Sequence, residues 1–446
     1  MQSSTLKPRC TQCASSRAAP LRARRMRVVR AASASAATGA ENHQPEPNEQ
    51  RRRQQQQQQA GSQRRRELLL SAAAAAAAGV VLPGGLGLGA GAAAAAGDAA
   101  GAAGGALPLV PKAQLTPRLA VSKVIKGCWQ LSGGHKGDKA TDRTAGREAV
   151  ADFRPFYDAG ITSFDMADHY GPAEALAGKF LASDPALRPG CQVLSKYCVF
   201  SPLEMASVSG AAVRKAIDTS RKRLGVERVD MMQFYWGSYE VPRYVDAALY
   251  LMDLRAEGVI GEVGVTNFDV PRLEAMNKAG VEIASNQVQY SLLDRRPTVA
   301  MAGYCAANGI AMLPYGVLGG GFLSDKYLGA DVGDVRADTY SKGKYGAVIV
   351  ESLGGWQGLQ RLLGELRPIA DKHSTSIANV AARWVLQQPG VPAIIIGARN
   401  ASHVADHRAL FAFELDSNDL AAAAGALAGG KQPAGDCYAW ERGGGF

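Results

Sequence analysis

Short apolar runs alternate with amphipathic stretches along the chain from Leu107 onward. Eight of these runs are almost continuously apolar and are bounded by Gly or Asp, which is typical of strands buried on both faces of a parallel sheet. We expect strands at VSKVIKG (121–127), ITSFDMA (161–167), CQVLSKY (191–197), VDMMQFY (229–235), IGEVGVT (260–266), EIASNQVQY (282–290), IAMLPYG (310–316) and PAIIIGA (392–398).

The segments between these runs have helical spacing. Val213, Ile217 and Leu224 recur on one face while basic residues take the other positions, and Gly225 follows as at a helix end. Eight strand–helix units predict an α/β fold, a (β/α)8 TIM barrel over residues 107–430, followed by a C-terminal tail, 431–446. An open doubly wound sheet would show the same alternation and remains an alternative.

Residues 1–106 have a different composition. The first 40 are rich in Arg, Ser and Ala and contain no Asp or Glu, which is typical of a transit peptide. Further on, QRRRELLLS precedes an Ala/Gly stretch that ends near Ala96, and this order is typical of a twin-arginine export signal. We therefore expect a targeting leader that directs the protein to the chloroplast, with the thylakoid lumen as its destination. If the Ala/Gly stretch is only a low-complexity linker, the protein stays in the stroma.

The net charge of the chain belongs almost entirely to this leader. Residues 1–106 carry +9 of the total of +10, so the remainder is nearly neutral and shows no nucleic-acid footprint. The leader's Ala/Gly stretch is too poor in large apolar residues to span a membrane, so we expect no span in the mature protein. The five cysteines after the leader are scattered, which predicts neither a disulfide framework nor a metal site.

Three residues with complementary chemistry follow apolar runs. Asp165 and Tyr170 lie in SFDMADHYGPAE, and Lys196 lies in VLSKYCVF. A Tyr after a strand is by itself usually a packing residue, but an ammonium beside a phenol favours its ionisation, and a carboxylate offsets the cost of burying the ammonium. The set can deliver a proton to a carbonyl that accepts a hydride. Other polar, aromatic and glycine residues also occur where expected strands end, which is the face where barrel enzymes carry their sites.

The order of these motifs, from Thr116 to Leu420, resembles the aldo-keto reductase family. The resemblance implies an NADP(H)-dependent oxidoreductase that reduces a small aldehyde or ketone by direct hydride transfer. It implies Tyr170 as the general acid, Lys196 as the group that lowers its pKa, and Asp165 as the partner of Lys196. No role follows for Asp168, and His169 is interpreted as a loop residue.

The cofactor side also carries family motifs, in GVTNF, SNQVQYS, LPYGVLGGGFLSDKY and IIIGARNASHVADH. By itself Asn267 would suit a helix cap equally well. His403 and His407 stand where the family commonly has Gln and Asn, so the adenine contacts stay open. The resemblance implies an NADPH site with Thr266, Asn267 and Gln287 at the nicotinamide carboxamide, Tyr315 beneath the ring, Gly316, Leu318 and Gly319 at the pyrophosphate, Gly397 in a tight turn and Arg399 at the ribose 2′-phosphate.

One residue departs from the family pattern, since Tyr235 stands where a substrate-orienting His is usual. Three interpretations remain: carbonyl reduction with Tyr235 as the hydrogen-bond donor, which we favour, an altered substrate class, or lost catalysis in a cofactor-binding regulatory subunit. Trp129, Phe200, Trp236 and the C-terminal CYAWERGGGF are candidates to line the substrate pocket, although each aromatic would equally suit packing.

Overall fold

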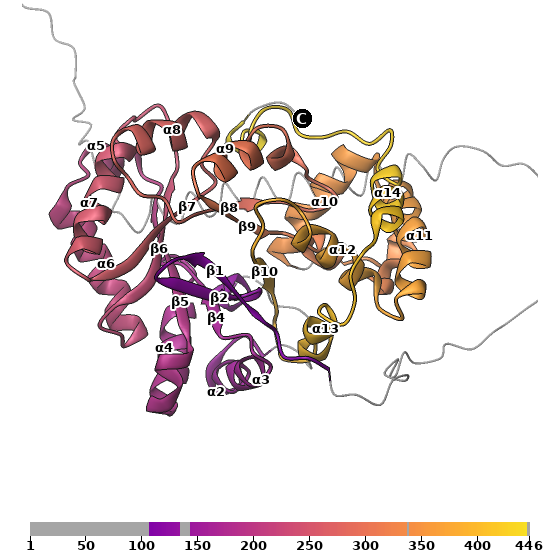
Figure 1. Cartoon of the computed structure of the whole chain (residues 1–446), viewed down its shortest axis with the longest axis horizontal. Helices are drawn as coiled ribbons and strands as arrows, with labels where there is room; N and C mark the ends of the chain where they lie inside the picture. The colour runs from indigo at the N-terminus through magenta and orange to yellow at the C-terminus, as the bar shows by residue number, and fades with distance from the viewer. Residues whose placement is uncertain (1–106, 134–142, 337–338, 444–446) are drawn as a thin grey trace, which may run out of the picture. The chain divides into compact units, whose positions relative to one another are not determined.

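The computed structural model describes residues 107–133, 143–336 and 339–443. The expected leader, residues 1–106, lies outside these ranges. Eight parallel strands form one sheet in the order β10-β3-β4-β5-β6-β7-β8-β9, and β10 lies beside β9, so the sheet curls into a barrel (Figure 1). The strands are β3 (Val124–Gly127), β4 (Ser163–Asp165), β5 (Gln192–Val199), β6 (Val229–Trp236), β7 (Ile260–Thr266), β8 (Ser285–Gln289), β9 (Ala311–Tyr315) and β10 (Ile394–Gly397).

Helices follow the strands along the chain and lie outside the sheet (Figure 1). This arrangement confirms the predicted (β/α)8 fold and excludes the open doubly wound sheet. The α-helices are α2 (Gly146–Ala151), α3 (Phe153–Asp158), α4 (Ala173–Ser183), α5 (Pro202–Ala206), α6 (Gly210–Leu224), α7 (Tyr244–Ala256), α8 (Val270–Lys278), α9 (Met301–Ala307), α10 (Tyr340–Leu353), α11 (Trp356–Lys372), α12 (Ile377–Leu386), α13 (Val404–Ala409) and α14 (Ser417–Gly425).

Short 3-10 helices occupy several loops: η1 (Trp129–Ser132), η2 (Pro185–Gly190), η3 (Arg296–Thr298), η4 (Gly319–Gly321), η5 (Asp325–Tyr327), η6 (Val332–Asp334) and η7 (Trp440–Arg442). Helices η1 and η4 follow β3 and β9 at the carboxyl end of the barrel. Helix η7 belongs to the C-terminal tail.

Helix α6 shows how the local sequence sets an element. The hydroxyl of Ser209 accepts a hydrogen bond from the backbone N–H of Ala212, which satisfies one of the free donors of the first turn. Val213 and Ile217 are fully buried on its inner face. Gly225 ends the helix with φ 66°, a left-handed conformation that glycine adopts without steric cost. The helix and its terminus are as predicted.

The first expected strand, residues 121–127, is two elements. An antiparallel hairpin of β1 (Lys112–Thr116) and β2 (Leu119–Ser122) ends just before β3 begins. Leu119 and Val121 of the hairpin pack against Ile125, Leu194 and Leu313 inside the barrel. The apolar run is continuous because both elements are buried, so periodicity alone does not reveal the break.

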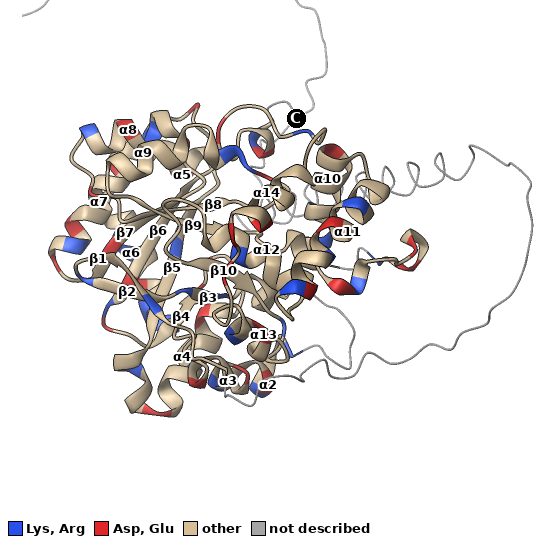
Figure 2. Ribbon diagram, turned by 45° about the vertical axis from the view of Figure 1, so that its right-hand side comes forward, with Lys and Arg blue, Asp and Glu red and all other residues tan. Residues whose placement is uncertain are grey.

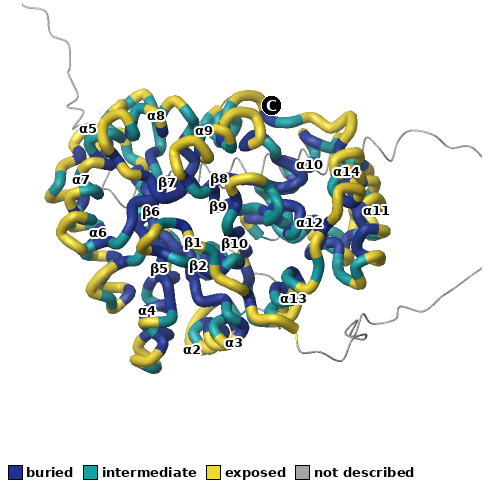
Figure 3. Tube along the Cα trace, viewed as in Figure 1, coloured by how far each residue is buried: buried dark blue, intermediate teal, exposed yellow. Residues whose placement is uncertain are grey.

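Burial follows the layers of the fold. The strands of the sheet are buried, whereas the outer faces of the helices are exposed (Figure 3). Along the described part of the chain, Lys and Arg alternate with Asp and Glu on the helices (Figure 2), in line with the near-neutral charge outside the leader. Among the described residues, no helix has both the length and the apolar character needed to cross a bilayer.

Candidate active site

The carboxyl ends of the strands bring the predicted residues to one end of the barrel. Asp165 ends β4, Thr266 ends β7 and Tyr315 ends β9. Lys196 and Tyr235 lie within β5 and β6, near the carboxyl ends of these strands. The convergence expected from the sequence is therefore present at this face.

Asp165 and Lys196 are buried, and the half-buried Tyr170 lies beside them in a compact cluster. The ammonium of Lys196 donates to Oδ1 and Oδ2 of Asp165 at 2.9 and 2.7 Å, and to the carbonyl of Met166 at 2.9 Å. The same nitrogen lies 4.8 Å from the centre of the Tyr170 ring. The side chain of Lys196 is only 2% exposed, so its pairing with Asp165 takes place almost without water.

Burial and charge oppose each other at Tyr170. Burial raises the pKa of the phenol and Lys196 lowers it, and burial prevails, so the pKa of Tyr170 stands at about 12. Burial also works against the charged form of Lys196, but the carboxylate of Asp165 raises the pKa of Lys196 above its ordinary value. At neutral pH the ammonium is therefore charged and the phenol holds its proton. The expected effect of Lys196 is present, but it is smaller than that of burial.

Two amides complete the surroundings of Asp165. Gln233 and Gln287 donate to Oδ1 of Asp165 at 2.8 and 2.7 Å, and Gln287 also donates to the amide oxygen of Gln233 at 2.7 Å. The amide nitrogen of Gln287 thus holds the carboxylate in place. Sequence reasoning missed Gln233, although a Gln within the apolar run VDMMQFY was a usable signal, because a buried amide needs a partner.

On the cofactor side, Asn267 and Tyr315 are linked. Asn267 has φ 60°, and its side-chain oxygen accepts a hydrogen bond from the Tyr315 hydroxyl at 3.0 Å. Helix α8 is capped by Asp269, so the capping interpretation of Asn267 is wrong. The hydroxyl of Thr266 is buried and has no hydrogen-bond partner among the described residues.

The glycine-rich loop after β9 packs against helix α10. Gly316 and Gly319 have φ values of 73° and 55°, and Leu318 between them is half-buried. A Cβ at Gly316 would collide with the hydroxyl of Tyr345 on α10. The structure therefore gives this glycine a packing role in addition to its left-handed backbone.

Helix α10 also places an ammonium in the site. Lys344 lies 4.8 Å from the ring centre of Tyr315, 5.3 Å from that of Tyr345 and 5.9 Å from that of Tyr438. Burial lowers the pKa of Lys344, although Glu441 opposes that shift. Lys344 has no ion pair with any residue in the described ranges. Its ammonium is therefore available to bind an anionic group next to Tyr315. Nothing in the sequence pattern marked this lysine.

The predicted adenosine end lies after β10. Gly397 is the last residue of β10 and does not have a left-handed φ; a Cβ there would collide with the amide of Gln130. The Nη1 atom of Arg399 is buried and has no partner among the described residues. His407 is buried against Phe156, and burial lowers its pKa to about 4, so it is a neutral core residue.

The C-terminal tail covers this end of the barrel. Arg442 donates to the backbone carbonyls of Asn267 and Trp236 at 2.9 and 2.8 Å. Glu441 accepts two hydrogen bonds of 2.9 Å from the guanidinium of Arg296. The tail is thus tied to three separate loops, and its residues 438–442 belong to the site.

Tyr235 lies beneath this tail. Its ring centre is 5.3 Å from that of Phe200 and 6.2 Å from that of Tyr438. Burial raises the pKa of Tyr235, against the nearby charge of Arg442. Of the expected lining residues, Phe200 and the tail surround Tyr235. Trp236 is fully buried beside Phe234 in the core.

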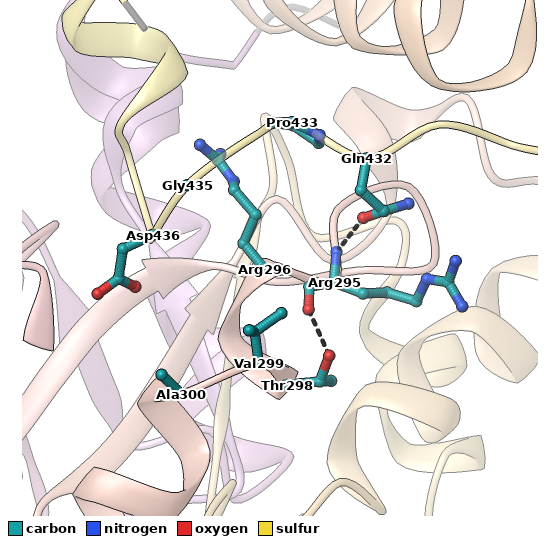
Figure 4. A pocket seen from close by; sticks show the side chains of 9 residues that line it. All are labelled: Arg295, Arg296, Thr298, Val299, Ala300, Gln432, Pro433, Gly435 and Asp436. Atoms are coloured by element: carbon teal, nitrogen blue, oxygen red, sulfur yellow. Dashed lines mark hydrogen bonds between the residues drawn. The ribbon is translucent and has the colours of Figure 1, made fainter. Parts of the chain in front are cut away.

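Trp129 lies in η1 and is half-buried. A separate cavity of about 500 Å³ lies at the base of the tail, between η3 and Gln432–Asp436 (Figure 4). The backbone N–H of Arg295 donates to the side-chain oxygen of Gln432 at 2.6 Å across its edge. The tail is therefore held at its start by Gln432 and at its end by η7, with open space beneath its middle.

Comparison with known proteins agrees with this geometry. Residues 123–427 match the model of the Aldo/keto reductase family. The chloroplastic pyridoxal reductase of Arabidopsis thaliana is 26% identical over 273 residues, which cover 58% of this chain and 71% of that protein. The NADH-specific methylglyoxal reductase of Escherichia coli K12 is 24% identical over 322 residues, 68% of this chain and 94% of that protein.

A solved structure is also similar. An aldo/keto reductase from Klebsiella pneumoniae, determined in complex with NADP and acetate, superposes with a TM-score of 0.53 at 23% identity. The match covers 71% of this chain and 94% of that one. At this identity the likeness is one of fold, and it supports the barrel described above.

Proposed function

Because the chain belongs to the aldo/keto reductase family, whose members are NAD(P)-dependent oxidoreductases, we propose that it is an NADP(H)-dependent reductase of aldehydes or ketones. The observation that carries the proposal is the buried pair of Lys196 and Asp165 beside Tyr170. A protonated hydroxyl next to a fixed cation is suited to donate a proton to a carbonyl oxygen as negative charge develops there, because the cation stabilises the phenolate that remains.

The residues at the barrel mouth fit a reduced nicotinamide dinucleotide phosphate. Among the buried polar atoms that lack partners in the described ranges are Thr266 Oγ1, near the predicted carboxamide position, and Arg399 Nη1, near the predicted 2′-phosphate position. Lys344 adds a half-buried cation beside Tyr315. A bound dinucleotide phosphate would supply the hydrogen-bond partners that these groups lack. When bound, the reduced nicotinamide supplies the hydride.

Support for the nucleotide also comes from relatives. The similar Klebsiella pneumoniae structure contains NADP, whereas the Escherichia coli relative is named for NADH. Nucleotide choice therefore varies among similar proteins and depends on residues at the adenosine end. In this chain Arg399 favours NADPH, because a guanidinium forms paired hydrogen bonds with a phosphate.

The proton step follows from the electrostatics of the cluster. With a pKa of about 12, Tyr170 is protonated at neutral pH and is ready to donate to the carbonyl oxygen. Lys196 lies close enough to stabilise the phenolate that remains. Asp165 and its two amide donors hold Lys196 in one place, so little reorganisation accompanies the transfer.

Tyr235 takes the position of the usual histidine. We propose that its hydroxyl, next to the ring of Tyr438, donates a hydrogen bond that orients the substrate carbonyl. The tail encloses this hydroxyl among aromatic rings, which suits a substrate with an apolar portion next to its carbonyl. The replacement of the usual histidine by Tyr235 is the one observation that favours the second candidate, a cofactor-binding regulatory subunit without efficient turnover.

Purified protein with NADPH and a panel of aldehydes and ketones separates these functions. We expect substrate-dependent oxidation of NADPH, followed at the absorbance of the reduced nicotinamide. Tight binding of NADPH without oxidation by any carbonyl would favour the regulatory subunit. Absence of both binding and turnover would contradict both functions.

For residues 1–106 we propose a targeting leader with a transit peptide and a twin-arginine signal, which delivers the barrel, 107–430, and its tail, 431–446, to the chloroplast and on to the thylakoid lumen. Its composition supports this, as does one similar protein named as chloroplastic. A fluorescent protein fused behind residues 1–106 tests it. Diffuse stromal fluorescence would eliminate export, and cytosolic fluorescence would eliminate the leader.

A further inference from the structure

Asp168, His169 and Cys198 lie together beside the proposed active site. Asp168 and His169 belong to the turn after β4, and Cys198 belongs to β5. Each offers one ligand atom, and the three atoms all lie within 4.8 Å of one another. We propose that these three side chains bind a thiophilic divalent cation of the zinc type, independently of the reductase chemistry.

Existing hydrogen bonds already hold the two segments in register. The second carboxylate oxygen of Asp168 accepts from the backbone N–H of Cys198 at 3.1 Å, and the N–H of Asp168 donates to the carbonyl of Lys196 at 3.2 Å. These bonds leave Oδ1 of Asp168 on the side of His169, 3.1 Å from its Nδ1. One carboxylate oxygen thus anchors the turn, and the other is placed to bind a cation.

The imidazole of His169 is oriented by two aromatic rings. Its ring centre lies 4.8 Å from that of Tyr170 and 5.0 Å from that of Phe200, and both contacts are edge to face. A ring held in this way loses less rotational freedom when it binds a metal. His169 is exposed, whereas Asp168 and Cys198 are half-buried, so the site is open to solvent from one side.

The donor set selects the class of cation. Thiolate, imidazole and carboxylate together are ligands of Zn²⁺ and similar cations, whereas Mg²⁺ and Ca²⁺ take oxygen ligands. Bonds of about 2.0 Å to N and O and about 2.3 Å to S place tetrahedral ligand atoms roughly 3.3 to 3.6 Å apart. The Asp168–His169 distance of 3.1 Å is already close to this value, and a maximum of 4.8 Å requires only side-chain rotation.

The surrounding charges permit a cation. Arg223 is the nearby guanidinium, but it donates to the backbone carbonyl of Asp168 and to the carboxylate of Glu174, at 2.9 and 3.1 Å. Lys196 is paired with Asp165. The side chain of Asp168 therefore has no ion pair with Lys or Arg in the described ranges. Burial disfavours the thiolate of Cys198 in the absence of a metal, and a bound cation would offset that cost.

Three protein ligands leave one coordination position for water or another small ligand, as in open zinc sites. Because His169 contacts the ring of Tyr170, a bound cation would place positive charge beside the proposed general acid. We expect Zn²⁺ to change the rate of carbonyl reduction reversibly, with the original rate restored when a chelator is added. The binding itself does not depend on turnover and is tested separately.

Cobalt reports the site directly, because a Co²⁺–thiolate bond has a charge-transfer absorption band. The full chain is titrated with Co²⁺ and then with Zn²⁺, on a background with Cys10→Ser and Cys13→Ser that removes the leader's CxxC thiols. We expect one equivalent of Co²⁺ to produce the band and Zn²⁺ to remove it. Mg²⁺ should have no effect on the band.

Cys198→Ser should abolish the band. His169→Gln should weaken Co²⁺ binding by at least about 10- to 100-fold, because the loss of a residue that merely supports a metal ligand already weakens binding by that factor. His403→Gln is the matched control, because His403 and Asp406 form a similar pair, 3.0 Å apart, without a nearby cysteine. That variant should bind as the parent does. His169 is exposed, so its replacement keeps the test valid if Cys198→Ser does not fold. Absence of the band in the parent, or an unchanged band in Cys198→Ser, would overturn the proposal.

Discussion

Replacement of Arg399 by Met should convert the nucleotide preference of the protein. The Nη1 atom of Arg399 is buried and lacks a partner among the described residues, so it is free to bind the phosphate that distinguishes NADPH from NADH. Met keeps much of the length of the side chain while removing its charge. The substitution therefore removes the proposed phosphate contact without opening the adenosine end of the site.

The magnitude follows from the kind of bond that is lost. A hydrogen bond to a charged group contributes about 1.5–3 kcal/mol. At about 1.36 kcal/mol for each factor of ten, NADPH should bind roughly 10- to 150-fold more weakly to Arg399→Met. The affinity for NADH should remain within about twofold, because NADH has no group at that position.

Equilibrium titration of protein fluorescence with each nucleotide measures both affinities. Lys344→Met is the matched control, because Lys344 lies beside Tyr315, 4.8 Å from its ring centre, and is remote in sequence from the adenosine loop. It should weaken NADPH and NADH by the same factor. Equal losses for both nucleotides in Arg399→Met, or an unchanged affinity for NADPH, would refute the assignment of Arg399.

The other predictions concern the carbonyl side of the site. Tyr235→Phe should lower turnover about 2- to 10-fold, because it removes one hydrogen bond, and should leave the affinity for NADPH unchanged. Unchanged turnover in steady-state assays would show that the hydroxyl does not polarise the substrate. Because Tyr170 has a pKa of about 12, its protonated form is fully present below that value, and carbonyl reduction should show no basic limb between about pH 6 and 9. A limb near neutrality that disappears in Tyr170→Phe would contradict this electrostatic picture. Glu441→Gln removes the charge that pairs with Arg296, so limited proteolysis should cleave the tail faster and the KM for the carbonyl substrate should rise. A tail as resistant to proteolysis as that of the parent would contradict the anchoring role of Glu441.

The sequence was sufficient for the barrel because its strands are buried on both faces and therefore appear as apolar runs. It was also sufficient to place Asp165, Tyr170 and Lys196 near one another, since the carboxyl ends of parallel strands meet at one end of a barrel. The hairpin before β3 was missed for the same reason that the strands were found. Continuous burial hides the point at which one element ends and the next begins.

Other parts of the site depend on contacts that no local pattern encodes. Gln233 reaches Asp165 across 68 positions of sequence, and Arg442 reaches the carbonyl of Asn267 across 175. The direction in which the pKa of Tyr170 shifts could not be predicted from the sequence either, because it depends on how far the effect of burial outweighs that of the charge on Lys196. The packing of Gly397 against Gln130 was likewise beyond the sequence pattern, since the two residues are distant in the chain.

The central claim is that Tyr170 donates the proton in a hydride transfer to a carbonyl. Single-turnover reduction of a reactive aldehyde by the NADPH-loaded protein tests it, with the parent and Tyr170→Phe compared after NADPH binding is measured for both. We predict equal NADPH affinity and a rate about 10²- to 10⁴-fold lower in Tyr170→Phe, the contribution of a positioned general acid. Equal single-turnover rates in the two proteins would contradict the account.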